Sequence, residues 1–246
     1  DRVHIGPSSS ATKKVRRSGQ SDDRAVPVSS DEETVPSDDR AGGHCGDGPT
    51  PAPAALFAVA PGVSTMISVV AVCGSRRRMS YTRKSLELVL EAARNEGTET
   101  ELLDLGAVDL PLYHPDVDEQ GDSARLTRIV RDAEAVVIGS PVYHGSYSSA
   151  FRNFHDYCSK DEYRDTAVGL VATAGGGSYG ATLEHMRSTV RGVYGHTVPE
   201  QVGIRRASEK YDGDTLTDVD VAHRLEELGV AVVAEARRLH PEAVSE

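Results

Sequence analysis

The fold of this chain is decided by residues 66–84, which read MISVVAVCGSRRRMSYTRK. Residues 67–73 are an apolar, largely β-branched run, which predicts a buried strand. A polar loop follows, and from about Ser80 the apolar residues recur at the spacing of an amphipathic helix. Backbone N–H groups at a helix start, together with hydroxyls and arginine side chains, suit a phosphate group. The segment therefore predicts a strand–loop–helix unit that holds a phosphorylated ligand.

The same alternation of strands and helices continues along the chain. Further strands are expected at about 99–104, 135–139, 167–173 and 201–204, of which 135–139 is a continuous apolar run. Amphipathic helices are expected at about 80–95, 123–132, 148–159, 181–191 and 218–239. Strands that alternate with helices form a parallel sheet covered on both faces. Five of them predict an α/β fold, a flavodoxin-like three-layer sandwich with strand order 2-1-3-4-5, in which ligands bind beyond the carboxyl ends of the strands.

Composition divides the chain at Met66. Residues 1–65 are rich in Ser, Asp, Gly and Pro and have few large apolar side chains. Such a segment buries too little apolar surface to offset its ordering entropy. We expect residues 1–65 to be a disordered or spurious N-terminal extension, with Met66 as the natural start, or else a genuine disordered tail. Residues 66–246 are expected to form one flavodoxin-like domain, which is long enough for a substantial core.

Charge and cysteine usage narrow the class of partner. The net charge of −11 argues against a nucleic-acid partner. Cys45, Cys73 and Cys158 are widely spaced, so neither a disulfide framework nor a zinc site is expected. We expect a reducing, cytoplasmic location instead. No apolar run approaches the ~20 residues of a membrane span. The sequence shows no spacing typical of a metal site, and we expect none.

The first loop, residues 74–82, carries the phosphate hypothesis. Ser75, Ser80 and Thr82 offer hydroxyls, and residues 76–78 are three consecutive arginines. A phosphate monoester carries about two negative charges and accepts several hydrogen bonds. The loop is therefore interpreted as a phosphate site. The alternative is an ordinary strand-to-helix loop whose arginines are solvated.

The second loop, residues 139–147, reads GSPVYHGSY and follows the third strand. Pro141 restricts the backbone, and Gly145 permits a tight turn. The ring of Tyr143 is suited to lie against a flat ligand. His144 is interpreted as a positioning or structural group rather than a catalytic acid.

The third loop, residues 173–180, reads TAGGGSYG, and its glycines satisfy the pattern GxGxxG. In a dinucleotide site this pattern follows the first strand, and an acidic residue about 20 positions later ends the next strand. Here the pattern follows the fourth strand, and Glu200 falls at or before the fifth. The loop is therefore interpreted as one that brings backbone amides near a ring system. A flexible turn is the alternative.

Phosphoryl chemistry of the tyrosine-phosphatase type is not supported. Cys73 ends a strand before a polar loop, as the nucleophile of low-molecular-weight tyrosine phosphatases does. That chemistry needs C-x5-R-[ST], and Met79 stands where arginine is required. A Walker A loop is absent as well, since no Gly-Lys pair precedes a Ser or Thr. No catalytic nucleophile, acid or base is assigned.

These loops, in this order, resemble the NADPH-dependent FMN reductase family, which includes flavin, quinone, chromate and azo-dye reductases. The resemblance covers about residues 66–205. It rests on GSxRxxSYTR at 74–83, PxYHGS at 141–146 and the glycine loop at 175–180. Residues 151–157, which read FRNFHDY, are similar to the family's Lys/Arg-Asn-x-x-Asp-Trp/Tyr helix.

The resemblance implies a set of cofactor-binding residues. The FMN phosphate would be held by Ser75, Arg77, Ser80 and Thr82, with Tyr81 beside them. The isoalloxazine ring would be flanked by Pro141, Val142, Tyr143, His144 and Gly145, and its far edge approached by Gly175, Gly176 and Gly177. Val142 stands where many family members have glutamate.

The resemblance also implies an activity. A reduced nicotinamide, NADPH or NADH, stacks on FMN and passes hydride to it, and a small acceptor (flavin, quinone, azo compound or metal oxyanion) then takes its place. The cofactor carries the chemistry, and the protein supplies orientation. A homodimer or homotetramer is implied as well. Two alternatives remain open from the residues: a flavodoxin-type electron carrier that binds FMN without NAD(P)H activity, and a binder of a non-flavin phosphate ligand.

Overall fold

A computed structural model describes residues 66–118 and 120–244 of this chain. The predicted N-terminal extension, residues 1–65, lies outside the described residues. No helix among the described residues is long and apolar enough to cross a membrane.

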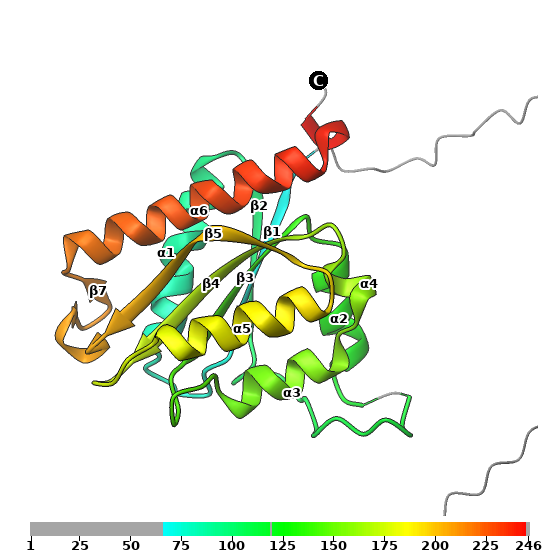
Figure 1. The fold of residues 1–246 in the computed structure, drawn as a ribbon, viewed down its shortest axis with the longest axis horizontal. Helices are drawn as coiled ribbons and strands as arrows, with labels where there is room; N and C mark the ends of the chain where they lie inside the picture. Colours follow the sequence, from blue (N-terminus) through cyan, green and yellow to red (C-terminus); the bar gives the residue numbers. More distant parts are fainter. Residues whose placement is uncertain (1–65, 119, 245–246) are drawn as a thin grey trace, which may run out of the picture. The chain divides into compact units, whose positions relative to one another are not determined.

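A five-stranded parallel sheet forms the centre of the described region (Figure 1). Its order is β2-β1-β3-β4-β5, which confirms the predicted flavodoxin-like arrangement. The strands are β1 Ser68–Cys73, β2 Glu99–Asp104, β3 Ala135–Pro141, β4 Ala167–Ala174 and β5 His196–Arg205. The direction in which successive strands are added to the sheet reverses between β1 and β3. These two parallel strands pair directly, with Cys73 opposite Gly139.

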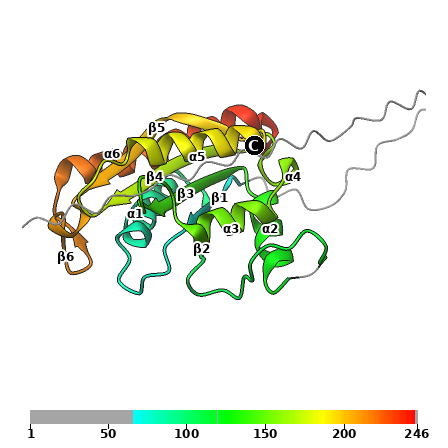
Figure 2. The same cartoon turned by 60° about the horizontal axis from the view of Figure 1, so that its bottom comes forward.

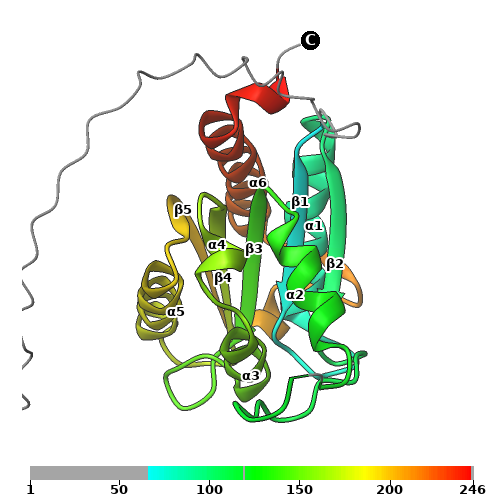
Figure 3. The same ribbon diagram turned by 90° about the vertical axis from the view of Figure 1, so that its right-hand side faces the viewer.

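Helices cover both faces of the sheet (Figures 2 and 3). One face packs against α1 Tyr81–Asn95 and α6 Val219–Leu239. The other packs against α2 Ser123–Arg131, α3 Ser149–Tyr157, α4 Lys160–Tyr163 and α5 Gly180–Gly192. Each helix contributes a stripe of apolar side chains, and the sheet lies between two hydrophobic clusters.

Strand β3 shows why the sheet is buried on both faces. Val137 belongs to the cluster beneath α1 and α6, whereas Val136 and Ile138 belong to the opposite cluster. All three side chains are fully buried. Burying one such side chain contributes about 1.5–3 kcal/mol. A central parallel strand is therefore apolar at every position and not only at alternate ones.

The starts of the two longest helices, α1 and α6, are fixed by side-chain caps. Ser80 caps α1 by accepting a hydrogen bond from the Arg83 N–H at 3.2 Å. Asp218 caps α6 by accepting from the Val221 N–H at 3.0 Å. These contacts satisfy donors that have no partner inside the helix.

Some predicted boundaries differ from those observed. Strand β5 begins at His196, five residues before the predicted start at residue 201. The sequence pattern missed this first half because Pro199 and exposed positions interrupt the apolar run. The helix predicted at 148–159 is observed as α3, Ser149–Tyr157, and the one-turn helix α4, Lys160–Tyr163, follows it outside the predicted range. Between β5 and α6 the chain forms a short 3-10 turn, η1 Ala207–Glu209, and a two-stranded hairpin, β6 Tyr211–Asp212 and β7 Thr215–Leu216, which the sequence patterns did not indicate.

Candidate functional site

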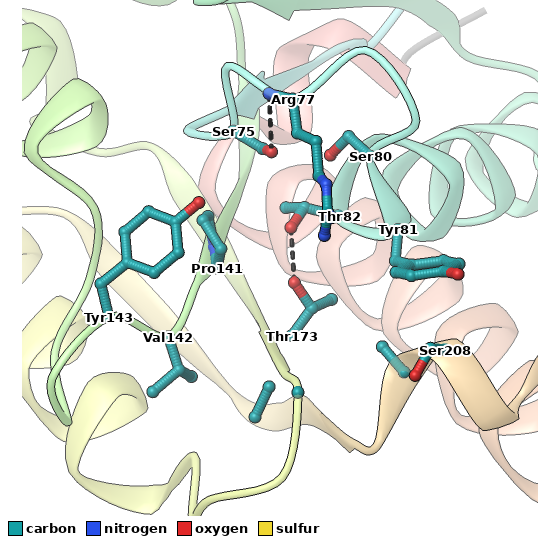
Figure 4. A pocket seen from close by; sticks show the side chains of 13 residues that line it. Ser75, Arg77, Ser80, Tyr81, Thr82, Pro141, Val142, Tyr143, Thr173 and Ser208 are labelled. Atoms are coloured by element: carbon teal, nitrogen blue, oxygen red, sulfur yellow. Dashed lines mark hydrogen bonds between the residues drawn. The ribbon is translucent and has the colours of Figure 1, made fainter.

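A cavity of about 310 Å³ lies at the carboxyl edge of the sheet, beside the switch point between β1 and β3. This volume is near the lower end of the range of small-molecule sites, about 300–1,000 Å³. Figure 4 shows its walls converging from the first loop, the start of α1, the second loop and η1. Its lining residues are Ser75, Arg77, Ser80, Tyr81, Thr82, Pro141, Val142, Tyr143, Thr173, Ala174, Gly175, Ala207 and Ser208.

Most of the residues predicted from the sequence line this pocket. The first loop contributes Ser75, Arg77, Ser80, Tyr81 and Thr82, the second contributes Pro141, Val142 and Tyr143, and the third contributes Gly175. Four predicted residues are absent from its lining: His144, Gly145, Gly176 and Gly177.

The tip of the second loop explains why His144 and Gly145 do not line the pocket. Both have positive φ, 52° and 80°, and they form a tight turn. The backbone groups of Tyr143 and Ser146 close this turn with two hydrogen bonds of 2.9 and 3.0 Å. The turn leaves Tyr143 at the pocket wall and carries the next two residues away from it.

Four lining residues were not predicted: Thr173, Ala174, Ala207 and Ser208. Thr173 and Ala174 end β4, so their position at the carboxyl end of a central strand was an available signal. Ala207 and Ser208 belong to η1, and no motif marks that turn in the sequence.

The first loop gathers buried hydrogen-bonding groups. Ser75, Ser80 and Thr82 are 4%, 2% and 1% exposed. Ser75 Oγ accepts from the Arg77 N–H at 3.4 Å. Ser80 satisfies the N–H of Arg83, but the first N–H groups of α1, at Tyr81 and Thr82, have no acceptor within the helix. The helix dipole adds a partial positive charge at the same point.

The three consecutive arginines differ in position. Arg77 lines the pocket, and Figure 4 shows its side chain extending from the first loop toward Thr82. All three arginines are exposed, but Arg76 and Arg78 are not part of the lining. The geometry therefore singles out Arg77 as the arginine available to an anion in the pocket.

A hydrogen bond between two threonines joins the first loop to the third. Thr82 Oγ1 and Thr173 Oγ1 are 2.5 Å apart, and both side chains are buried. One hydroxyl proton forms this bond, and the second needs an acceptor of its own. An oxygen atom of a ligand in the pocket would provide one.

Gly74 locks the first loop against its neighbours. Its N–H donates to the Gly139 carbonyl at 2.8 Å, and its own carbonyl accepts from Ser148 Oγ at 2.5 Å. A Cβ at this position would come within 2.9 Å of the Phe151 Cβ. Only glycine permits this close approach, so β1, β3 and α3 together fix where the first loop begins.

Two of the four tyrosines near the loops line the pocket, and the other two are partly buried against a hydrophobic cluster. Tyr81 and Tyr143 belong to the lining. Tyr147 packs edge-on against Phe151, with ring centroids 5.2 Å apart. Tyr179 packs against Gly203 of β5. Tyr143 is 53% exposed, and its ring is free to cover a planar ligand.

Cys73 does not have the properties of a nucleophile. Its side chain is fully buried, and its thiol donates to the Ser75 carbonyl at 3.9 Å. Burial raises the pKa of the Cys73 thiol to about 11. The thiol is therefore protonated at neutral pH, whereas thiol chemistry requires the thiolate.

The donor set fits FMN. Buried hydroxyls, one arginine and free helix N–H groups at one end suit a phosphate dianion. Pro141, Val142 and Tyr143 offer apolar and flat surface for a ring at the other. Cβ atoms built on the glycines at 175–177 would meet nothing within 4 Å, so this backbone borders open space. Among the residues that the structure describes, no three potential ligands are grouped for a metal ion.

Comparison with known proteins gives relatives that are named as azoreductases. An NADPH azoreductase of Bacillus sp. (strain OY1-2) is 33% identical over 139 residues, which are 55% of this chain and 75% of that relative. An FMN-dependent NADPH-azoreductase of Staphylococcus aureus (strain USA300) is 29% identical over 137 residues, 53% of this chain and 73% of the relative.

Solved structures show the same fold. The flavoenzyme NAD(P)H:(acceptor) oxidoreductase FerB from Paracoccus denitrificans superposes with a TM-score of 0.61 at 22% identity, over 70% of this chain and 98% of FerB. A flavodoxin from the domain Archaea superposes with a TM-score of 0.50 at 12% identity, over 70% of this chain and 99% of the flavodoxin.

The family model described as NADPH-dependent FMN reductase matches residues 67–209, which contain every element that lines the pocket. The match, the two azoreductase relatives and the flavodoxin-like sheet agree with one another. The chain belongs to the NADPH-dependent FMN reductase family.

Proposed function

We propose that the pocket at the carboxyl edge of the sheet is the FMN site of this NAD(P)H-dependent oxidoreductase. One observation carries the assignment: a phosphate-binding donor set and a flat apolar wall meet in a single cavity at the strand switch point. The proposed cofactor-binding residues are those of the three loops, Thr173 and Ala174 included, together with Ala207 and Ser208 of η1.

The residues of the chain bind and orient the cofactor. Arg77 neutralises the phosphate, and the start of α1 donates backbone N–H groups to it. Tyr143 and Pro141 bound the ring on one side. The open backbone at 175–177 leaves room for a nicotinamide or an acceptor to approach. When bound, FMN supplies a ring that accepts hydride from NADPH and passes reducing equivalents to the acceptor.

We propose an azo compound as the electron acceptor. The two relatives described above are named azoreductases, and both match this chain over about three quarters of their own length. A free flavin, a quinone and a metal oxyanion are the competing acceptors.

A spectroscopic experiment tests the FMN assignment. The purified protein is incubated with FMN, desalted and examined by visible absorption, first in air and then after anaerobic addition of NADPH. We expect retained flavin absorbance that bleaches with NADPH and returns on addition of an azo dye. Flavin that stays oxidised in NADPH contradicts the reductase activity. A protein that binds no FMN in an equilibrium titration contradicts the site itself.

We propose three further properties of the whole chain. Residues 66–246 act as one reductase domain, and the function does not depend on residues 1–65. The sparse, widely spaced cysteines favour a cytoplasmic location. A homodimer or homotetramer follows the habit of the family. Comparing the NADPH-dependent activity of residues 66–246 with that of the full chain tests the first of these proposals, and light scattering tests the third.

A further inference from the structure

The segment that follows β5 folds back toward the start of α1, beside the pocket. Its first turn, η1, brings Ala207 and Ser208 into the pocket wall, and the β6–β7 hairpin follows directly. Figure 4 shows Ser208 and Tyr81 on the same side of the pocket. The family match ends at residue 209, before the hairpin. The hairpin therefore needs an explanation from its own contacts.

Lys84 fastens this hairpin to α1. Its side chain is only 8% exposed, although it carries a charge. Its ammonium group donates to the Gly213 carbonyl at 2.7 Å and forms an ion pair with Asp214 at 2.8 Å. Burying a charged group is costly unless it is paired and hydrogen-bonded. Both partners of Lys84 lie in the turn of the hairpin, so this side chain connects two parts of the chain about 130 residues apart.

Tyr211 continues the connection to the pocket wall. Its ring packs against that of Tyr81, with centroids 5.1 Å apart. The Lys84 ammonium lies 5.4 Å from the Tyr81 ring centroid and 5.9 Å from that of Tyr211, within the range of cation–π attraction. Tyr81 is therefore supported from behind by both side chains.

Ser85 completes the fastening. The Tyr211 hydroxyl and Ser85 Oγ are hydrogen-bonded at 2.8 Å. Ser85 Oγ also donates to the Tyr81 carbonyl at 2.8 Å. The hairpin thus contacts the first turn of α1 through an ion pair, a ring contact and a hydroxyl pair.

We propose that residues 207–216 form a clamp, fastened by Lys84, that holds Tyr81 and Ser208 in position against bound FMN. Lys84 is then a positioning residue, since it acts through Tyr81 and does not line the pocket. The proposal rests on the assignment of FMN to this pocket. Side chains that are already ordered before binding lose less conformational freedom when the ligand arrives, which strengthens affinity.

The first test is the affinity of the apoprotein for FMN, measured by flavin fluorescence. We expect Lys84→Met to weaken binding about tenfold and Lys84→Arg, which keeps the charge and the donors, to restore most of it. The matched control is Lys160→Met, because Lys160 is exposed at the start of α4. Unchanged affinity in a folded Lys84→Met protein overturns the clamp.

A double-mutant cycle separates positioning from general destabilisation. If Lys84 acts through Tyr81, the effects of Lys84→Met and Tyr81→Leu on FMN affinity will be non-additive. We also expect the fluorescence of bound FMN to rise in Lys84→Met as the Tyr81 ring moves away. Additive effects, with no change in bound fluorescence, overturn the proposal.

A variant at an exposed site covers the case in which Lys84→Met does not fold. Asp214→Asn removes the ion-pair partner at a side chain that is 85% exposed. We expect it to weaken FMN binding by about threefold, and unchanged affinity counts against the clamp. Wild-type protein that does not bind FMN refutes the proposed function instead, so the two failures are distinguishable.

Discussion

At the scale of single residues, position separates side chains that the sequence makes look equivalent. Arg76, Arg77 and Arg78 are consecutive, but only Arg77 lines the pocket. The same is true of cysteine: Cys73 ends the strand that leads into the site, yet its thiol is buried and protonated. Arg77 is therefore expected to differ from Arg76 and Arg78 in its effect on FMN affinity, and Cys73 is expected to be unreactive as a thiol.

The arginine at the pocket is expected to dominate phosphate binding. Arg77→Ala should weaken FMN binding about 10- to 100-fold, since a hydrogen bond to a charged group contributes about 1.5–3 kcal/mol. Arg76→Ala and Arg78→Ala are matched controls and should change affinity by less than about threefold. Fluorescence titration of the three apoproteins measures the difference. Equal losses in all three variants would mean that the loop attracts phosphate only through its summed charge.

The buried thiol is expected to be inert. At pH 7.5 a pKa of about 11 leaves Cys73 almost entirely protonated, so iodoacetamide should leave it unmodified in the folded protein. Peptide mapping by mass spectrometry separates Cys73 from the other cysteines. The protein should also fail to hydrolyse an aryl phosphate. Rapid alkylation of Cys73 in folded protein would contradict the burial described above.

At the scale of elements, α3 links the sheet to the long connection between β2 and α2. Asn153 accepts from the Tyr113 N–H at 2.9 Å and donates to the Pro111 carbonyl at 2.7 Å. The Tyr157 hydroxyl lies 3.0 Å from the same carbonyl. The Asn and Tyr of the FRNFHDY helix therefore act as tethers for this connection, whose Leu112 is 83% exposed.

Removing the Asn153 side chain is expected to make the connection between β2 and α2 more mobile and to leave the rest of the structure unchanged. Asn153→Ala should lower the free energy of unfolding by about 1–2 kcal/mol and speed amide exchange around residue 113. Arg152→Ala, at the neighbouring position, removes a partly exposed ion pair with Asp156 and a contact with Tyr147, neither of which touches the connection, and serves as the control. Hydrogen-exchange mass spectrometry measures the amide exchange rates of both variants. Faster exchange across the sheet as well would show that Asn153 supports the core.

The elements also show what sequence patterns reveal. β1, β3 and β4 are apolar runs buried on both faces. The predicted bounds of β1 to β4 all fall within two residues of those observed. β5 is an edge strand with exposed positions, so only its apolar half was indicated. The hairpin strands, Tyr211–Asp212 and Thr215–Leu216, are too short to produce any periodicity.

The residues of the candidate site likewise fall into a group that the sequence predicts and a group that it does not. The three loops follow apolar strands, so their place at one edge of the sheet was predictable from topology. Ala207 and Ser208 reach the pocket because η1 and the hairpin return to α1 through contacts made by Lys84 and Tyr211. Such contacts join residues far apart in sequence, and no local pattern encodes them.

At the scale of the whole molecule, stability depends on pH through a buried histidine. His155 is 5% exposed and lies between Phe151 and Tyr163, with ring centroids 5.4 Å away on each side. Burial lowers the pKa of His155 below its ordinary value. The unfolded chain therefore takes up this proton at a higher pH than the folded protein does.

The sign of the effect follows from this linkage. The contribution of neutral His155 is fully present above the unfolded pKa of about 6.5 and is lost as pH falls through and below that value. His155→Phe should make the thermal midpoint less sensitive to a change from pH 7.5 to 5.0. His223→Gln, at an exposed histidine, is the control. Equal drops for wild type and His155→Phe would remove His155 as the cause.

The position of α6 at the end of the chain has a consequence for synthesis. Val137 and Val171 of the central strands face the cluster that α6 closes through Leu225, Leu228 and Val232. At about 5–20 residues per second, the ribosome leaves that apolar surface uncovered for a few seconds after β5 has emerged. The nascent chain is thus a substrate for a holding chaperone during this interval. A premature stop before Val219 would yield an aggregating fragment and not a smaller reductase.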